Sequence, residues 1–512
     1  MTPTSAKSSS PGSTRALLAG AALYALALAL RAWGADGQPD DWDGADFVLA
    51  LDEFDLERWQ PHFPGYPVYV GAAWLLHQTG VGAAAALESV GAALGALAPV
   101  ALVAILRRGS AGRGPWPWLA GCLAATQPAL VWQGGRIGTD AAGLGLAAAA
   151  LALLLHGRRG LGGFVLGVAM GVRPSYFPFL ALVFLPGRTE SAGIRPLESS
   201  LRNSLAGLAL GLGAWLLPFV FLHGDALARS GVEFIGGHFQ DWGGTVLSTS
   251  SPAVLDRLRL WALQLVGVVA GMQEGPWPVA ALWGATLLAI AGACAAGAHR
   301  VRSIRSSMRF WCASGAYPAW ILLAQNPTSA RHLLPMALAA AALPLAPRSP
   351  RLRWAVFIVL ASAWAPLAVC IQAAQRAHAP PAATLAAALS ASSIRTDDRL
   401  FAGASWRLLE LHGLGRRLHL DRARSFADAL EEVNAQLHAP ENVFVTSELS
   451  GIPGTSRPVA SLRRPAIPWD ERLELHRFRV CTGDRGLATL ATPEPRAEQG
   501  LRRLTPDLVV FG

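Results

Sequence analysis

The residues best suited to chemistry lie in one acidic segment near the N-terminus, between Ala35 and Tyr66. It holds nine acids against a single base, Arg58; the acids are Asp36, Asp40, Asp41, Asp43, Asp46, Asp52, Glu53, Asp55 and Glu57. A carboxylate can accept a proton as a general base, or it can bind a divalent cation such as Mg²⁺ or Mn²⁺. For most of these acids the plainer interpretation, a solvated acidic loop, is preferred.

A short stretch downstream of Asp43 is rich in residues that fix turns. It reads His-Phe-Pro-Gly-Tyr-Pro from His62 to Pro67. Proline and glycine restrict or require particular turn conformations, so this loop is expected to hold one shape. A rigid loop beside a carboxylate is typical of a binding site, which singles out Asp43 among the nine acids.

Two further motifs carry charged residues at the ends of apolar runs. One reads Gln-Pro-Ala-Leu-Val-Trp from Gln127 and continues to Gly-Thr-Asp at Asp140; the other reads Ala-Arg-His-Leu-Leu-Pro from Ala330. Taken alone, Asp140 suits a helix N-terminus and Arg331 suits an anchor at a membrane interface. Each motif is therefore open to a structural and a functional interpretation.

Apolar segments must position these residues. The chain has 512 residues, 52% of them hydrophobic and only 15% charged, where soluble domains have roughly 25% charged residues. Runs near the ~20 residues that cross a bilayer as a helix occur at 16–33, 82–106, 115–132, 139–155, 161–173, 174–186, 204–222, 277–298, 309–324, 332–347 and 354–373. We predict about eleven transmembrane helices, with a break where Arg173 meets Pro174.

Basic residues set the expected orientation. Arginine clusters near 107–113, 158–159, 188–202, 300–309 and 348–353 fall on one side together with Lys7 and Arg15, and the acidic loop falls on the other. The positive-inside rule then places the N-terminus in the cytoplasm and the acidic loop outside. Two more apolar segments, 66–78 and 258–272, are predicted to be interfacial or re-entrant helices on the outer face.

The composition becomes polar from about Ala374, after which Pro380-Pro381 marks a linker. Residues 374–512 are predicted to form a soluble extracytoplasmic α/β domain, with strands at 442–446 and 473–480 and a helix at 425–437. The domain organisation is thus a disordered cytoplasmic N-terminus at 1–15, a multi-spanning domain at 16–373 with an acidic outer loop at 34–65, and the C-terminal domain. A cleaved signal peptide ending near Ala32 or Ala35 is the less favoured alternative.

The net charge of +9 does not indicate a nucleic-acid partner, because the arginines cluster at the ends of apolar runs. The five cysteines offer no disulfide framework and are interpreted as packing residues.

The three motifs together resemble those of the multi-spanning GT-C glycosyltransferases, in the protein O-mannosyltransferase-like and arabinose-transferase-like branches. In that family an acid follows the first span and a His/Pro-Pro-Gly-Tyr-Pro-like stretch comes next, and here Phe63 replaces a frequent proline. The resemblance covers roughly residues 16 to 373 and implies an all-α GT-C-like membrane domain in the cytoplasmic membrane, which uses a polyprenyl-phosphate sugar donor.

The resemblance also implies roles for individual residues. Asp43 would be the general base of an inverting transfer to a hydroxyl of a glycan or protein acceptor. Asp140 would contact the acceptor or a divalent cation, and Arg331 and Arg136 would bind the donor phosphate. His62 and Tyr66 would contact the donor or shape its loop.

Two other classes of membrane protein fit parts of the sequence. A transporter or lipid flippase would also need many spans, but it predicts charges near the membrane midplane, where this chain has few apart from Glu88 and Arg173. A non-catalytic assembly partner that binds through the C-terminal domain is the third interpretation.

Overall fold

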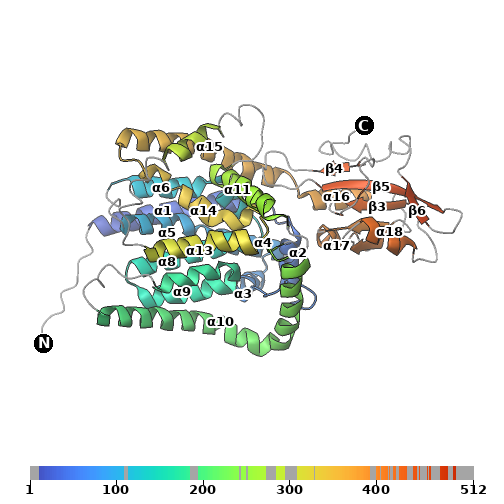
Figure 1. Ribbon diagram of the computed structural model, residues 1–512, viewed down its shortest axis with the longest axis horizontal. Coiled ribbons are helices and arrows are strands. Elements are labelled where there is room, and N and C mark those ends of the chain that lie inside the picture. Colours follow the sequence, from blue (N-terminus) through green and yellow to red (C-terminus); the bar gives the residue numbers. More distant parts are fainter. Residues whose placement is uncertain are drawn as a thin grey trace. The chain divides into compact units, whose positions relative to one another are not determined.

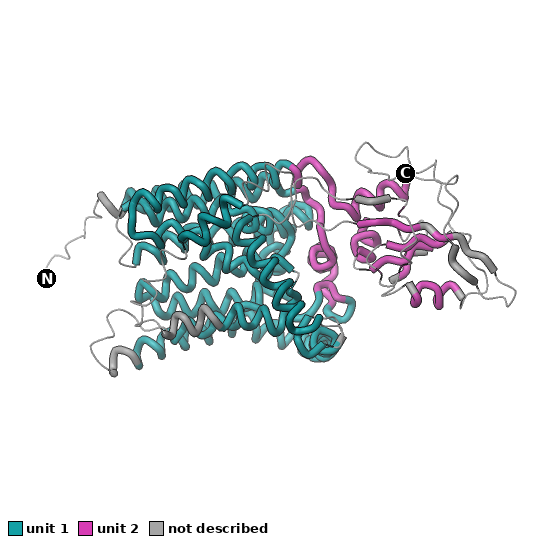
Figure 2. The backbone as a smooth tube through the Cα atoms, turned by 45° about the horizontal axis from the view of Figure 1, so that its top comes forward, with its two compact units in different colours: residues 1–35, 56–58, 62–373 teal, residues 36–55, 59–61, 374–512 magenta. Residues whose placement is uncertain are grey.

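The computed structural model contains two compact units. Unit 1 comprises residues 1–35, 56–58 and 62–373, and unit 2 comprises residues 36–55, 59–61 and 374–512 (Figure 2, teal and magenta). The structure describes residues 11–108, 114–184, 194–241, 244–248, 252–271, 284–293, 308–327, 329–391, 399–403, 405–412, 414, 419–422, 426–434, 442–446, 449, 452, 458, 460–462, 473–482 and 488–491.

Unit 1 consists of helices joined by turns, and none of its described residues forms a strand of the sheet (Figure 1). Its α-helices are α1 Pro11–Gly34, α3 Pro67–His77, α4 Ala83–Gly95, α5 Leu97–Arg108, α6 Trp116–Thr126, α7 Pro128–Gly134, α8 Asp140–Leu155, α9 Arg159–Val172, α10 Ile194–Gly236, α11 Val254–Ala270, α13 Met308–Ala324, α14 Leu334–Ala340 and α15 Pro350–Ala377. Short 3-10 helices, η1 Pro174–Phe184, η5 Ala330–Leu333 and η6 Leu343–Leu345, and a π-helical turn, η3 Gly237–Asp241, join them.

Four of the described helical stretches are long and apolar enough to cross a membrane: Thr14–Gly34, Ala83–Arg108, Glu198–Gln240 and Pro350–Ser390. Five shorter apolar helices accompany them, at Asp140–Leu155, Arg159–Val172, Pro174–Phe184, Gly284–Ala293 and Ala330–Leu345. The mostly helical fold with several apolar helices is therefore as expected. The count of eleven spans, and the interfacial position expected for 66–78 and 258–272, stay predictions, although α3 and α11 cover these two segments.

Proline sets several helix boundaries. It occupies the first or second position of α3, α6, α7 and α14, where its missing N–H costs nothing because first-turn amides have no partner within the helix. The expected break between Arg173 and Pro174 is confirmed, because α9 ends at Val172 and η1 begins at Pro174.

The N-terminal expectation was wrong for five residues. Residues 11–15, which were assigned to a disordered N-terminus, belong to α1, which begins at Pro11. Proline is tolerated in the first turns of a helix, so Pro11 does not keep these residues out of α1. The remaining residues of that expected segment, 1–10, lie outside the described part of the chain.

Glycines bring α9 and α10 into close contact, and the two helices lie side by side in Figure 1. A Cβ atom on Gly167 of α9 would lie 2.6 Å from the backbone nitrogen of Leu212 in α10, which is closer than atoms can approach. Gly163 and Gly207 are similarly crowded, by the backbone of Ser204 and Gly160. Small residues at this spacing let two apolar helices pack backbone to backbone, as in membrane helix pairs.

Unit 2 contains a six-stranded mixed sheet in the order β2-β1-β3-β5-β4, with β6 also paired to β5. Its strands are β1 Arg399–Ala402, β2 His419–Arg422, β3 Asn442–Thr446, β4 Ala460–Leu462, β5 Leu473–Thr482 and β6 Ala488–Ala491, and its helices are α2 Trp42–Asp52, α16 Pro381–Ala391, α17 Trp406–Leu411 and α18 Phe426–Asn434. Strand β1 runs parallel to β2 and β3, while β5 runs antiparallel to β3, β4 and β6. The strands expected at 442–446 and 473–480 are confirmed. The helix expected at 425–437 is confirmed as α18 over Phe426–Asn434, and its remaining residues lie outside the described part of the chain.

Both faces of this sheet are buried. Leu400 and Phe444 pack with Leu385 of α16 and Leu409 of α17 in one core. The alternate residues, Phe401, Val443 and Val445, pack with Ala429 and Val433 of α18 in a second core. Successive side chains of a strand point to opposite faces of the sheet, so α16 and α17 cover one face and α18 covers the other.

Helix α2, which carries Asp43, is part of unit 2 rather than unit 1. It packs on α17, and Ala45 is fully buried in the core that contains Leu400 and Leu409. The side chain of Asp41 caps the helix, because its Oδ1 accepts a hydrogen bond from the amide of Gly44 at 2.8 Å. A large part of the acidic segment is therefore an ordered helix.

Candidate active site

A buried ion pair joins the ends of two helices in unit 1. Asp140 is the first residue of α8 and Arg173 caps the C-terminus of α9, and Nη2 of Arg173 lies 2.9 Å from Oδ1 of Asp140. Nη1 of Arg173 also donates to Oγ1 of Thr139 at 3.1 Å. Only 3% of Asp140 and 6% of Arg173 is exposed, so each charge depends on the other for compensation.

His332 of η5 completes this cluster. Its Nδ1 lies 4.0 Å from Oδ1 of Asp140 and 3.5 Å from Nη2 of Arg173. In the contact with Arg173 the imidazole nitrogen accepts, because a guanidinium group has no acceptor. The motif that begins at Ala330, through His332, and the motif that ends at Asp140 therefore both contact Arg173.

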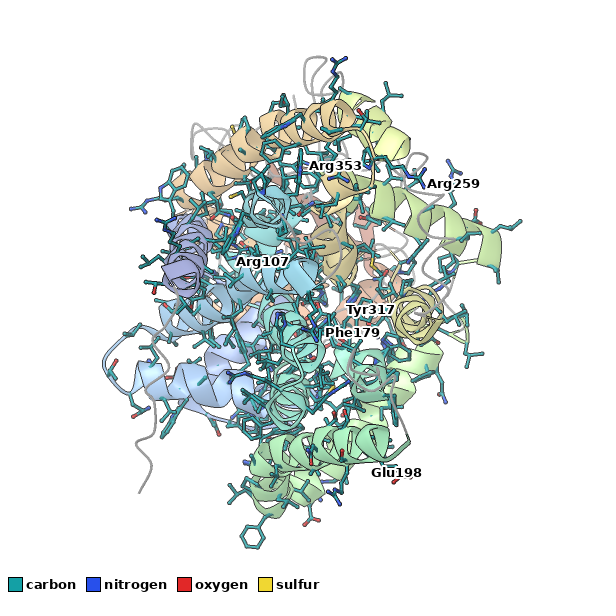
Figure 3. The ribbon with its side chains drawn as sticks, turned by 90° about the vertical axis from the view of Figure 1, so that its left-hand side faces the viewer. Arg107, Phe179, Glu198, Arg259, Tyr317 and Arg353 are labelled. Atoms are coloured by element: carbon teal, nitrogen blue, oxygen red, sulfur yellow. The ribbon has the colours of Figure 1, made fainter. Side chains whose placement is uncertain are left out.

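Two tyrosines fix the backbone beneath these charges. The hydroxyl of Tyr176 donates to the carbonyl of Asp140 at 3.0 Å, and that of Tyr317 donates to the carbonyl of His332 at 2.9 Å. Their ring centroids lie 5.3 Å apart, and Phe179 stacks on Tyr317 at 4.9 Å (Figure 3). This aromatic layer keeps water from one side of the cluster, which strengthens its electrostatic interactions.

The turn from His62 to Pro67 lies at the same cluster. Nε2 of His62 is 2.9 Å from the hydroxyl of Tyr66, and the His62 ring stacks on Phe234 of α10 with centroids 5.8 Å apart. Tyr66 is near enough to Arg173 to interact with its charge. Its backbone has a φ of 46°, a left-handed conformation that costs a non-glycine residue on the order of 1 kcal/mol or more. The fold thus holds Tyr66 in a strained backbone conformation, with its hydroxyl hydrogen-bonded to His62.

Arg331 lies beside His332 on η5 and is close enough to Arg173 for the two positive charges to repel each other. Four of the residues singled out from the sequence, His62, Tyr66, Asp140 and Arg331, therefore gather around Arg173 in unit 1.

Arg136, the other expected phosphate ligand, packs its guanidinium group over the ring of Trp132 at 4.7 Å from the ring centroid. The turn that follows it is held by Tyr69, whose hydroxyl accepts from the amide of Gly138 at 3.2 Å and donates to the carbonyl of Leu87 at 3.0 Å. Arg136 thus has a packing role that the sequence did not suggest, and its role toward phosphate stays a prediction.

Asp43 lies in the first turn of α2 and is half-buried. It belongs to unit 2, whereas Asp140 and Arg331 belong to unit 1. Its role as the catalytic base stays a prediction.

Four residues of the cluster were not proposed as site residues from the sequence: Arg173, Tyr176, Tyr317 and His332. A signal for Arg173 was available, because it is a charged residue between two apolar runs, where charges are costly and commonly functional. The tyrosines gave no signal, since an aromatic residue in an apolar helix is ordinarily part of the core.

The cluster does not suit a divalent cation. No group of three or more His, Cys, Asp or Glu side chains that could hold a metal occurs among the described residues. The carboxylate of Asp140 instead faces a guanidinium group at 2.9 Å, so a cation there would meet a positive charge. The expected Mg²⁺ or Mn²⁺ therefore finds no support at Asp140.

No protein-family model matches this chain, and no curated protein matches it. Two solved structures are similar along nearly its whole length. ArnT from Cupriavidus metallidurans bound to undecaprenyl phosphate has a TM-score of 0.39 and 13% identity, covering 95% of this chain and 100% of that one. The apo state of the same protein has a TM-score of 0.38 and 14% identity, covering 94% and 100%. The roles of individual residues are argued from the geometry of this chain alone.

Proposed function

We propose that this protein is a membrane glycosyltransferase that moves a sugar from a polyprenyl-phosphate donor to a hydroxyl of a glycan or protein acceptor. The observation that carries the proposal is the meeting of three separated motifs on one residue of unit 1. The turn at His62, the helix start at Asp140 and the segment at Arg331 all converge on Arg173.

Guanidinium groups are well suited to the departing lipid phosphate. Arginine keeps its charge at any physiological pH, and its planar fork matches phosphate oxygens. In the proposed site Arg331 binds the phosphate, Arg173 supports it, and Asp140 holds Arg173 in position. Asp140 therefore acts by positioning an arginine, in place of the acceptor or metal contact expected from the sequence.

Asp43 is the proposed general base. The acceptor hydroxyl gives its proton to the Asp43 carboxylate as its oxygen forms a bond to the anomeric carbon. The bond from that carbon to the phosphate oxygen breaks, and the lipid phosphate leaves with the electron pair. Attack opposite the leaving group inverts the configuration of the sugar.

The proposed location is the cytoplasmic membrane, with the N-terminus in the cytoplasm and unit 2 outside. The support is the arginine distribution along the sequence together with the long apolar helices. A cysteine-accessibility map checks the orientation, because residues 36–60 should react with an impermeant thiol reagent from outside. Reaction only from the cytoplasmic side would overturn it.

The test of function is Asp43→Asn, with Asp52→Asn as its matched control. Asp52 is an exposed acid at the last residue of the same helix. Membranes containing each variant are given undecaprenyl-phosphate-linked hexoses and pentoses, and transfer of labelled sugar is measured. We expect Asp43→Asn to lower the rate about 100-fold or more, the range for a general base, and Asp52→Asn to match wild type. Equal rates in all three proteins would overturn the assignment of Asp43, and no transfer by wild type from any of these donors would overturn the proposed function.

A further inference from the structure

Helix α2 is fastened to the C-terminal part of unit 2 by a buried ion pair. Asp46, three residues after Asp43, is fully buried, and its Oδ1 accepts a hydrogen bond from Nε of Arg407 in α17 at 3.0 Å. Only 8% of Arg407 is exposed, and its Nη1 also donates to Oε2 of Glu410 at 3.1 Å. Removing one partner would leave the other charge buried, which makes the pair costly to break.

Two tryptophans surround this ion pair. The rings of Trp42 in α2 and Trp406 in α17 have centroids 5.8 Å apart. The guanidinium carbon of Arg407 lies 5.9 Å from the centroid of the Trp42 ring and 5.4 Å from that of Trp406. Arg407 thus combines an ion pair with two cation–π contacts. The ion pair with Asp46 and the contact with Trp42 connect α17 to α2.

The contacts define which face of α2 is docked. Trp42, Ala45 and Asp46 have the i, i+3 and i+4 spacing of one helix face, and all three contact α17 or the core beneath it. Asp43 follows Trp42 by one residue and therefore lies about 100° around the helix from it, at the border of the docked face. A rotation of α2 would move Asp43 with it.

We propose that Arg407 is a positioning residue for Asp43: through Asp46 it holds α2 in the one rotation that presents the Asp43 carboxylate for proton transfer. This inference rests on the proposed function. It gives the C-terminal domain a part in catalysis, because the helix that carries the general base is packed into that domain's core.

The same unit offers a matched control. Arg399 of β1 is 5% exposed, and its Nε donates to Oδ2 of Asp421 in β2 at 2.8 Å. Like Arg407, Arg399 is a buried arginine paired with an aspartate, although Asp421 is partly exposed, and Arg399 also lies 3.6 Å from Glu432 of α18. These contacts join two strands and α18, and they do not involve α2. Loss of either pair should destabilise unit 2, whereas only the loss of the Arg407 pair should release α2.

The experiment compares Arg407→Gln, Arg407→Lys and Arg399→Gln in the full-length protein in lipid nanodiscs. For transfer from the undecaprenyl-phosphate sugar that wild type uses, we expect Arg407→Gln to lower kcat 10- to 100-fold with KM for the donor unchanged, as for a misplaced catalytic group. Arg407→Lys should recover part of the loss, because it keeps the charge, and Arg399→Gln should stay near wild type. An equal loss of kcat in Arg407→Gln and Arg399→Gln would show that only the integrity of the domain matters and would overturn the inference.

A second measurement does not depend on activity. Ala45 is fully buried in the docked face, so Ala45→Cys, in a chain whose five native cysteines are replaced by serine, should react slowly with a thiol reagent. Adding Arg407→Gln should raise the labelling rate at least several-fold, and adding Arg399→Gln should not. Unchanged labelling in Arg407→Gln would overturn the inference even if wild type is an active transferase. Increased labelling in a protein whose wild type transfers no sugar would instead overturn the proposed function, and with it the catalytic purpose of the contact, while the docking of α2 by Arg407 would stand.

Discussion

The carboxylate of Asp140 and the guanidinium group of Arg173 form a buried ion pair, 2.9 Å apart, that ties the start of α8 to the end of α9. Each of these ends carries a partial charge from its helix dipole, positive at the start of α8 and negative at the end of α9. Asp140 and Arg173 therefore complement the helix ends on which they lie as well as each other. This arrangement explains why a charged pair is stable between apolar helices.

Breaking this pair should destabilise unit 1. Asp140→Asn leaves the Arg173 charge buried beside an uncharged amide, and such changes cost about 3–5 kcal/mol. Asp256→Asn is the control, because Asp256 is also in the first turn of its helix, α11, but is exposed. Thermal unfolding of the detergent-solubilised protein should show a clear fall in Tm for Asp140→Asn and little change for Asp256→Asn. Equal Tm values for the two variants would contradict a structural role of the pair.

Substitution of Arg331 should weaken binding of the donor lipid. Arg331→Gln removes one fork of the proposed phosphate site, and we expect the Kd for undecaprenyl phosphate to rise roughly 10- to 100-fold, as for a lost charge-assisted bond. Arg331→Lys should also bind poorly, because an ammonium group cannot form the paired contacts of a guanidinium group.

Arg259→Gln provides the control for this binding measurement. Arg259 is an exposed arginine of α11 (Figure 3), so the loss of its charge tests whether general attraction of the anionic lipid is enough. Binding by microscale thermophoresis or calorimetry should then be close to wild type. Equal weakening by Arg259→Gln and Arg331→Gln would show that net charge, and not a site, holds the lipid.

Gly167→Val should separate α9 from α10. The added side chain would meet the backbone of Leu208 and Leu212, so the helices must move apart and lose their close packing. We expect a loss of roughly 1–3 kcal/mol, as for overpacked sites. Gly20→Val in α1 is the control, since a Cβ atom there meets nothing within 4 Å. If both variants unfold at the same temperature in detergent, the glycine contact contributes no stability.

Unit 2 should lose stability in mild acid. Burial lowers the pKa of His476 from 6.5, with an opposing effect of Glu474, and burial also lowers the pKa of His412. As the pH falls through about 6.5 the unfolded chain binds protons that the folded chain does not, so the free energy of unfolding decreases there and levels off below the folded pKa values.

The variant His412→Gln/His476→Gln should therefore show a smaller change in Tm between pH 7 and pH 5 than wild type. His378→Gln changes a partly exposed histidine of the same unit and should leave that change as it is. A pH dependence that persists in the double variant would assign it to other groups.

The local features of the fold could be predicted from the sequence because they depend on residues close together in the chain. Apolar runs of about the length that crosses a bilayer, or somewhat shorter, become helices, and prolines at 67, 128, 174 and 335 mark helix boundaries. The alternation at 442–446 becomes β3, with successive side chains in opposite cores. Hydropathy predicts the helices, the backbone geometry of proline predicts their boundaries, and the alternation of apolar and polar residues predicts the strand.

The tertiary structure alone decided which distant residues meet. Nothing near Arg173 in the sequence indicates that it pairs with Asp140 or faces His332, because both partners come from other helices. Likewise, the sequence presented α2 as part of an outer loop of the membrane domain, yet Ala45 and Asp46 are buried in unit 2. The types of the candidate residues were readable from the chain, but their partners depend on long-range packing, in which a charge is buried only where the fold brings its counter-charge.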